Sequence, residues 1–196
     1  MDYQAARDFI TEQLRTGLKP QLTYHSIDHT IDVYESAMRI VRGEVLDEHQ
    51  IVLLKTATLM HDSGMLVTYQ GHEQAAVDLC ALWLPKYGYS LADIEQIADM
   101  ILATRLPQKA TSKLEQIICD ADLDYLGRDD FHMIAHRLRY EWNTLKIKQT
   151  SLREWYLLQI AFLESHSYFT KIAQDTRNVG KQENLRQIKE ICLLHG

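Results

Sequence analysis

The apolar residues of this chain recur mostly at intervals of three and four positions, which is the period of a helix with one buried face. No segment shows the alternation that is typical of a half-buried strand. The stretches with helical spacing cover about 2–18, 27–44, 47–60, 72–87, 90–104, 112–126, 129–142, 151–165 and 179–193. The pattern therefore predicts an all-α fold.

The stretch at 47–60 differs from the other predicted helices because it is apolar nearly all round from Ile51 to Met60. A helix without a polar face is expected to lie in the middle of the core. His61 and Asp62 follow it directly, and Gly64 is a natural stop for a helix. The sequence thus predicts a histidine and an aspartate at the end of the most buried helix.

Length and charge limit the function classes. The 196 residues suffice for one well-buried core, and no linker rich in Pro, Gly or Ser divides them, so a single compact multi-helix domain over 1–196 is predicted. The formal net charge of −6 argues against a nucleic-acid polymer as partner. A small anionic substrate is still compatible with that charge, because a bound divalent cation can dominate its own surroundings.

The cysteines and the N-terminus bear on location. The three cysteines are isolated, with no CxxC pair, which favours a reducing cytoplasm. The first residues lack the basic-then-apolar pattern of a signal peptide. No apolar run reaches the roughly 18 residues of a membrane span. We therefore expect a cytoplasmic protein with no membrane partner, whose oligomeric state the sequence leaves open.

Polar residues on apolar helix faces are the candidates for chemistry. His29 lies four residues before Val33 on the apolar face of the helix at 27–44, where Ser26 is a plausible N-cap. Asp122 lies four residues after Ile118 on the apolar face of the helix at 112–126. Both side chains should therefore point into the core rather than into water.

Together with His61 and Asp62, these residues bring two imidazoles and two carboxylates to the interior from three helices. A buried carboxylate without a partner is very costly, and a divalent cation would satisfy all four groups. This mixed set of nitrogen and oxygen ligands suits Mn, Fe, Co, Ni or Zn. Asp120 is the rival of Asp122, but we expect Asp120 and Asp124 on the wetter side of the helix.

Three stretches carry these residues: YHSIDHTIDV at 24–33, LMHDSGM at 59–65 and ICDADLDYLG at 118–127. Jointly they resemble the HD-domain superfamily of metal-dependent phosphohydrolases. The first is also similar to the corresponding segment of cyclic nucleotide phosphodiesterases. The resemblance covers about 20–130, and the rest, about 131–196, is predicted to be a helical C-terminal extension.

The resemblance implies a role for each matching residue. His29 corresponds to the first histidine ligand of the metal, and His61 with Asp62 to the HD pair. Asp122 corresponds to the last ligand. His25 corresponds to the histidine that, in the phosphodiesterase branch, protonates the leaving oxygen.

The chain also departs from the family pattern. Members that hold two metals with protein ligands usually supply two further histidines between the HD pair and the last aspartate. His72 could be one of these, but the place of the other reads Ala-Thr-Arg at 103–105. We therefore expect one tight metal, or a weaker second metal, such as Mg, bridged by Asp62. The missing histidine also counts against an oxygenase of HD type with two irons.

The expected function is hydrolysis of a phosphoester in a nucleotide or similar small molecule by metal-activated water. Asp62 would ligate the metal and orient the water, and His25 would be the general acid. A regulatory or ligand-binding module with little turnover is the alternative. Arg105, like His72, is a candidate for a phosphate or second-metal site. Further candidate cations occur late in the chain: Arg177, Lys181 and Arg186. A solvated helix surface is the simpler interpretation for each of these three and for Arg105.

Overall fold

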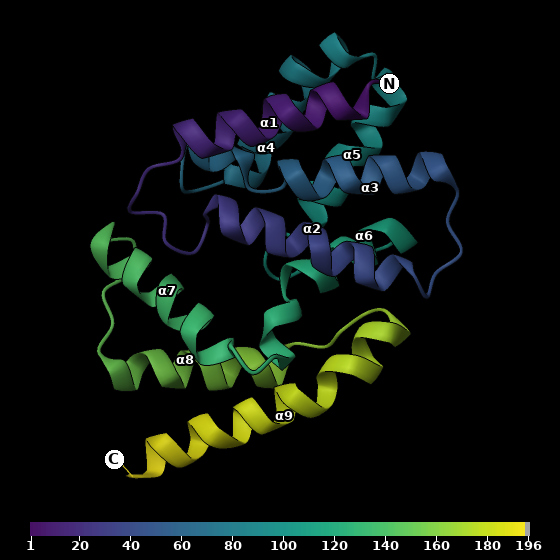
Figure 1. Ribbon diagram of the computed structural model, residues 1–196. Helices are drawn as coiled ribbons and strands as arrows, with labels where there is room; N and C mark the ends of the chain where they lie inside the picture. The colour runs from purple at the N-terminus through teal and green to yellow at the C-terminus, as the bar shows by residue number, and fades with distance from the viewer. Residues whose placement is uncertain (195–196) are drawn as a thin grey trace. The chain divides into compact units, whose positions relative to one another are not determined.

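The structure, a computed structural model, describes residues 1–194, and every regular element in that range is a helix. This confirms the predicted all-α class. The chain divides into two compact units (Figure 1). The first consists of 1–19 and 25–122, and the second consists of 20–24 and the residues from Leu123 onward. The prediction of a single domain over 1–196 stays a prediction.

The first unit contains six α-helices and two 3-10 helices among the described residues. They are α1 (Tyr3–Gly17), α2 (Ile27–Val41), α3 (Glu48–Met60), η1 (Ser63–Leu66), α4 (His72–Trp83), η2 (Leu84–Tyr87), α5 (Leu91–Ala103) and α6 (Lys113–Asp122).

Helix α3 lies at the centre of the first unit and packs against α1, α2, α5 and α6. Its side chains from Leu53 to Met60 are almost all buried. This confirms the central position that its lack of a polar face predicts. The residues that follow α3 therefore begin inside the unit rather than at its surface.

Local signals start the helices that carry the site. The Ser26 side chain accepts a hydrogen bond from the His29 amide and caps α2, as predicted. Asp47 and Gln50 form a reciprocal capping box at the start of α3. These caps fix where each helix begins, and so fix the phase in which its side chains face the core.

The end of α3 is tightened by a close backbone approach. A Cβ atom on Gly64 would lie 1.9 Å from the carbonyl oxygen of His72 and 2.7 Å from the amide nitrogen of Ala76. Only glycine lets η1 pack this closely against the start of α4. The glycine that the sequence offers as a helix stop therefore also joins the HD pair to the helix that begins at His72.

The second unit contains η3 (Asp124–Gly127), α7 (Phe131–Thr144), α8 (Leu152–Ser165) and α9 (Lys171–Leu194). Helices α8 and α9 pack side by side, and η3 packs on α9 (Figure 1). Gly127 and Gly180 permit that approach, since a Cβ on Gly180 would lie 2.1 Å from the Gly127 carbonyl oxygen. Asp124 accepts two hydrogen bonds from Arg177, which fixes η3 to α9.

Some predicted boundaries are wrong. The helix predicted over 72–87 changes to a 3-10 helix after Trp83, because Pro85 has no amide hydrogen to continue α-helical bonding. The last helix starts at Lys171 rather than near 179, with the Thr170 hydroxyl accepting from the Ala173 amide at its start. Within the described residues, no helix has both the length and the apolar character needed to cross a membrane.

We expect Gly64→Ala to lower the free energy of unfolding by about 1–3 kcal/mol, because the added methyl group meets backbone atoms that cannot turn aside. Chemical denaturation in the presence of a chelator measures the change. Gly17→Ala is the matched control, since its Cβ would meet only the flexible end of Leu66, 2.7 Å away. Equal stability of the Gly64 variant and the wild type would contradict the packing argument.

Candidate metal centre

The first unit brings together two groups of side chains that could each hold a metal ion, and no other such group occurs among the described residues. In each group, one potential ligand atom per residue lies within 4.8 Å of the others. The first group is His29, His61 and Asp122, and the second is His25, Asp62 and His72. All six residues belong to the first unit.

Asp62 lies close to both histidines of the first group. Its Oδ2 is 3.5 Å from Nε2 of His29 and 3.3 Å from Nε2 of His61. Asp122 Oδ1 lies 3.2 Å from the same atom of His29 and 3.7 Å from that of His61. Two carboxylates and two imidazoles thus converge on one buried point from α2, the end of α3 and the end of α6.

The other oxygen of Asp62 faces the second group. Asp62 Oδ1 is 3.3 Å from Nε2 of His72, at the start of α4. The ring centroid of His25 lies 5.4 Å from that of His72 and 6.3 Å from that of His29. The two oxygens of one carboxylate therefore point toward different groups, as a bridging ligand between two cations would.

Backbone carbonyls orient two of the imidazoles. Nδ1 of His61 lies 2.8 Å from the Thr58 carbonyl oxygen, and Nδ1 of His72 lies 3.0 Å from the Tyr69 carbonyl oxygen. A carbonyl oxygen only accepts, so each Nδ1 must carry the hydrogen. In the neutral imidazole, Nε2 then presents a lone pair to Asp62. This is the arrangement that metal-binding histidines usually show.

The Nε2 lone pair of a neutral imidazole and a carboxylate oxygen repel each other unless a proton or a metal ion lies between them. Nε2 of His61 and Oδ2 of Asp62 are both buried and make no hydrogen bond. Leaving such a charge unpaired costs several kcal/mol, far more than the 0.5–1.5 kcal/mol of an ordinary hydrogen bond. Either a proton or a metal ion must resolve the conflict. The donor set therefore fits a divalent metal held by His29, His61, Asp62 and Asp122.

In the metal-free protein, the pKa shifts of His61, Asp62 and His72 also indicate that this place favours positive charge. Burial alone would lower the pKa of His61, but the carboxylates of Asp62 and Asp122 raise it to about 9. Burial would raise the pKa of Asp62, but the neighbouring His61 and His25 bring it well below its usual range. The pKa of His72 is also raised, against its burial, mainly by Asp62.

Helix phase separates the three aspartates near the end of α6. Asp122 reaches His29 and His61, whereas Asp120 belongs to neither group of potential ligands. The expectation that Asp120 and Asp124 lie on the wetter side is wrong, since both are almost fully buried. Asp124 lies in η3 rather than α6, and there it binds Arg177.

Arg105 is the candidate phosphate-binding cation of the first unit. Its side chain is half-exposed, and its Nε lies 3.8 Å from Oε2 of Glu73. The same Glu73 oxygen is 3.9 Å from Nδ1 of His72. Arg105 is thus tied only loosely to the second group and has access to solvent.

The three late cations are engaged within the second unit. Arg177 binds Asp124, and Arg186 pairs with Glu183 and Glu190 on an exposed helix face. The expectation of a solvated surface is wrong for Lys181, which is buried and donates to the carbonyl oxygen of His166.

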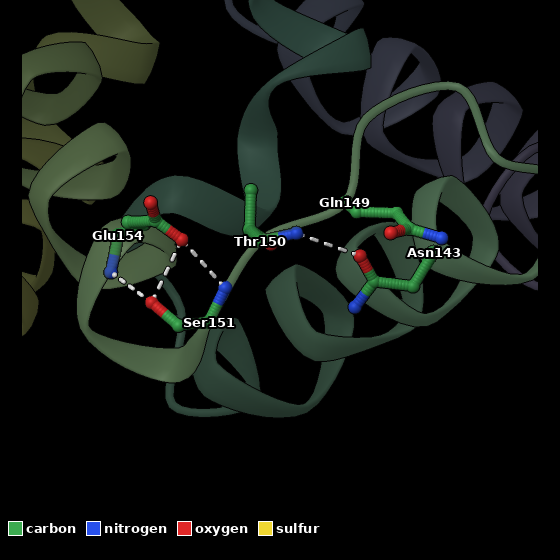
Figure 2. Close-up of a pocket in the computed structure, with 5 residues that line it drawn as sticks. All are labelled: Asn143, Gln149, Thr150, Ser151 and Glu154. Atoms are coloured by element: carbon green, nitrogen blue, oxygen red, sulfur yellow. Dashed lines mark hydrogen bonds between the residues drawn. The ribbon is translucent and has the colours of Figure 1, made fainter.

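A surface hollow of about 460 Å³ lies in the second unit and is lined by Asn143, Gln149, Thr150, Ser151 and Glu154 (Figure 2). Several of its polar groups form a helix cap: the Ser151 amide donates to Glu154, the Glu154 amide donates to the Ser151 hydroxyl, and the Thr150 amide donates to Asn143. We therefore assign it a structural role at the start of α8.

Sequence reasoning missed the groups that orient the imidazoles. The carbonyl oxygens of Thr58 and Tyr69 carry no sequence signal, because every residue has a carbonyl group. Glu73 has a weak signal, as the neighbour of His72 in the sequence.

The chain is similar to known proteins in sequence and in fold. Residues 26–124, half of the chain, match the model of the HD domain family. No curated protein matches the sequence. One similar solved structure is that of a predicted HD superfamily hydrolase from an uncultured Thermotogales bacterium, with a TM-score of 0.62 and 19% identity over 98% of this chain and 92% of that chain. At this identity the likeness shows the fold alone.

We expect the metal-free protein to lose stability as the pH rises. A histidine whose pKa is raised on folding stabilises the protein fully below its unfolded pKa of about 6.5, and loses that contribution as the pH passes its folded pKa of about 9. The melting temperature in chelator should therefore fall between pH 6.5 and 9, and His61→Asn should flatten the decline. If the melting temperature of that variant falls as steeply with pH as that of the wild type, His61 is not the source of the pH dependence.

We also expect Asp122→Asn to reduce bound metal by about tenfold or more, because the amide removes a charged ligand. Elemental analysis of protein purified without chelator measures the content. Asp120→Asn is the matched control, since it neutralises a buried aspartate on the same helix. If both variants keep as much metal as the wild type, Asp122 is not a ligand.

Proposed function

Because the chain belongs to the HD-domain family, we propose that it is a metal-dependent phosphohydrolase that cleaves a phosphoester in a nucleotide or similar small molecule. The observation that carries the proposal is the pair of histidine and aspartate groups joined by the two oxygens of Asp62. A mononuclear or dinuclear metal centre of this kind is suited to phosphoryl transfer to water.

The residues of the first group, together with Asp62, have a defined task in this proposal. His29, His61, Asp62 and Asp122 would hold a divalent ion such as Mn, Fe, Co, Ni or Zn. When bound, the ion would neutralise charge on the phosphoryl group and lower the pKa of a coordinated water. Asp62 would also orient the attacking water.

His25 is the candidate proton donor for the leaving oxygen. It is only partly buried, so substrate can reach it, and it stands next to His72 and Tyr69 rather than inside the first group. The same position also allows it to bind a second cation together with Asp62 and His72. These two roles make different demands, because a ligand must keep its nitrogen unprotonated whereas an acid must carry a proton.

Arg105 supports the choice of a phosphorylated substrate. Its guanidinium is half-exposed and held by a single loose contact to Glu73, so a phosphate could replace that contact. A guanidinium matches two phosphate oxygens at once. The formal net charge of −6 favours a small phosphate over a nucleic-acid polymer.

Turnover of candidate substrates tests the proposal. We expect nucleoside monophosphates, deoxynucleotides, cyclic nucleotides and 4-nitrophenyl phosphate, each assayed with Mn, Co and Mg, to include at least one substrate that releases its product. Asp122→Asn should abolish this turnover. Tight metal binding without turnover of any compound would instead support a regulatory or ligand-binding module.

The leaving group should reveal the role of His25. We expect His25→Ala to slow hydrolysis of a nucleotide by about 10²–10⁴-fold, because an alkoxide leaves poorly without a proton. Hydrolysis of 4-nitrophenyl phosphate should change far less, since nitrophenolate leaves unaided, and metal content should stay near that of the wild type. Loss of metal together with equal slowing of both substrates would assign His25 as a ligand instead.

A further inference from the structure

The loop between η1 and α4 carries a tyrosine next to the second group of candidate ligands. This loop, residues 67–71, belongs to the first unit, as do all residues of both groups. The Tyr69 ring packs edge-on against the His25 ring, with centroids 5.5 Å apart and ring planes at 83°. Aromatic rings prefer such edge-on arrangements at centroid distances of about 4.5–7 Å. The contact therefore favours one orientation of the His25 imidazole.

The backbone of Tyr69 contacts the other imidazole of this group. Its carbonyl oxygen accepts a hydrogen bond from Nδ1 of His72 at 3.0 Å, and Nε2 of His72 then faces Asp62. One residue thus contacts His25 through its ring and His72 through its backbone. A substitution changes the ring and leaves the carbonyl group in place, so the two contacts can be tested separately.

The loop that carries this ring is ordered by its own hydrogen bonds. The amides of Val67 and Thr68 both donate to the Gly64 carbonyl oxygen, at 2.8 and 2.9 Å. The Thr68 hydroxyl donates to the Gln70 carbonyl oxygen at 3.2 Å. The half-buried Tyr69 therefore stands on a compact turn that can hold its ring in place.

His25 needs such a contact because it precedes its helix. In a helix, the preceding turn restricts the rotamers of a side chain, whereas His25 comes before Ser26, the N-cap of α2. The rings of His29 and His72 also lie near it, with centroids at 6.3 and 5.4 Å, but both are candidate metal ligands. Tyr69 belongs to neither group of candidate ligands, so its ring is available to orient His25.

We propose that Tyr69 is a positioning residue whose ring holds the His25 imidazole in the orientation from which it donates a proton to the leaving oxygen. This proposal rests on the proposed function, in which His25 is that proton donor. It gives the loop 67–71 a task in catalysis that involves neither metal ligation nor contact with the substrate.

Three variants of the full chain test this role. Tyr69→Leu removes the aromatic ring, and Tyr69→Phe keeps the ring without the hydroxyl group. Val67→Ala is the matched control, because it truncates an exposed side chain of the same loop and leaves Tyr69 intact. Histidine ring resonances are recorded by NMR in metal-free protein, with His25→Ala to assign those of His25. Bound metal, kcat and KM are then measured with 4-nitrophenyl phosphate and with the best nucleotide from the screen.

We expect Tyr69→Leu to shift the ring resonances of His25, because the ring current of the tyrosine is lost. The same variant should lower kcat for the nucleotide by about three- to tenfold, with a change below about twofold in KM and in kcat for 4-nitrophenyl phosphate. Tyr69→Phe and Val67→Ala should both keep the kinetics of the wild type. Bound metal should be unchanged in all three variants.

A double variant shows whether Tyr69 acts through His25. We expect Tyr69→Leu to cause no further loss of nucleotide turnover in a protein that already carries His25→Ala, because two residues that act as one unit are not additive. A full additional loss in the double variant would mean that Tyr69 acts by another route, and the inference would be overturned.

Other outcomes separate the two proposals. If Tyr69→Leu leaves the resonances of His25 unchanged, raises KM without lowering kcat, or slows both substrates equally, the inference fails and the proposed function stands. Loss of metal in Tyr69→Leu also overturns the inference, since it assigns the effect to His72. If no substrate is turned over, or if His25→Ala leaves the ratio of the two rates unchanged, the proposed function fails and the positioning role fails with it.

Discussion

The carboxylate of Asp62, buried among three imidazoles, is the constraint on which the candidate site depends. Its Oδ2 faces His29 and His61, and its Oδ1 faces His72. A negative charge in the middle of a protein is tolerated only when a positive charge meets it. In the metal-free protein, the carboxylates raise the pKa of His61 to about 9, so that a protonated imidazole supplies the positive charge at neutral pH. A divalent cation would supply that positive charge instead, held by His29, His61 and Asp62 together with Asp122.

The helices of the first unit are arranged to keep that carboxylate in place. Helix α3 is surrounded by four other helices, so Asp62 begins in the interior. Gly64 lets η1 meet the start of α4 closely enough for His72 to approach the second oxygen. The carbonyl oxygens of Thr58 and Tyr69 then turn the imidazoles so that Nε2, not Nδ1, faces the carboxylate.

The two sides of the candidate site differ in how they are held. The candidate ligands of the first group stand on helices or at helix ends and are buried or nearly so. His25 precedes its helix and is only partly buried. A rigid group suits metal binding, and a more accessible one suits contact with substrate.

The sequence by itself determined the helical class, the central helix and the candidate residues His29, His61 and Asp62. These depend on the helical period and on adjacency in the chain, and both are local properties. Tertiary structure decided what depends on packing between distant segments. It separated Asp122 from the buried Asp120, it brought His72 to the other oxygen of Asp62, and it placed His25 in the same group as these two residues.

Tertiary structure alone also selected the groups that hold these side chains in place. The carbonyl oxygens of Thr58 and Tyr69 are invisible in a sequence, because all residues share the same backbone. The contact between the rings of Tyr69 and His25 joins positions far apart in the chain, and no periodic pattern links them. The type and spacing of side chains can be read from the sequence, whereas the partner of a buried charge is determined only when the helices pack together.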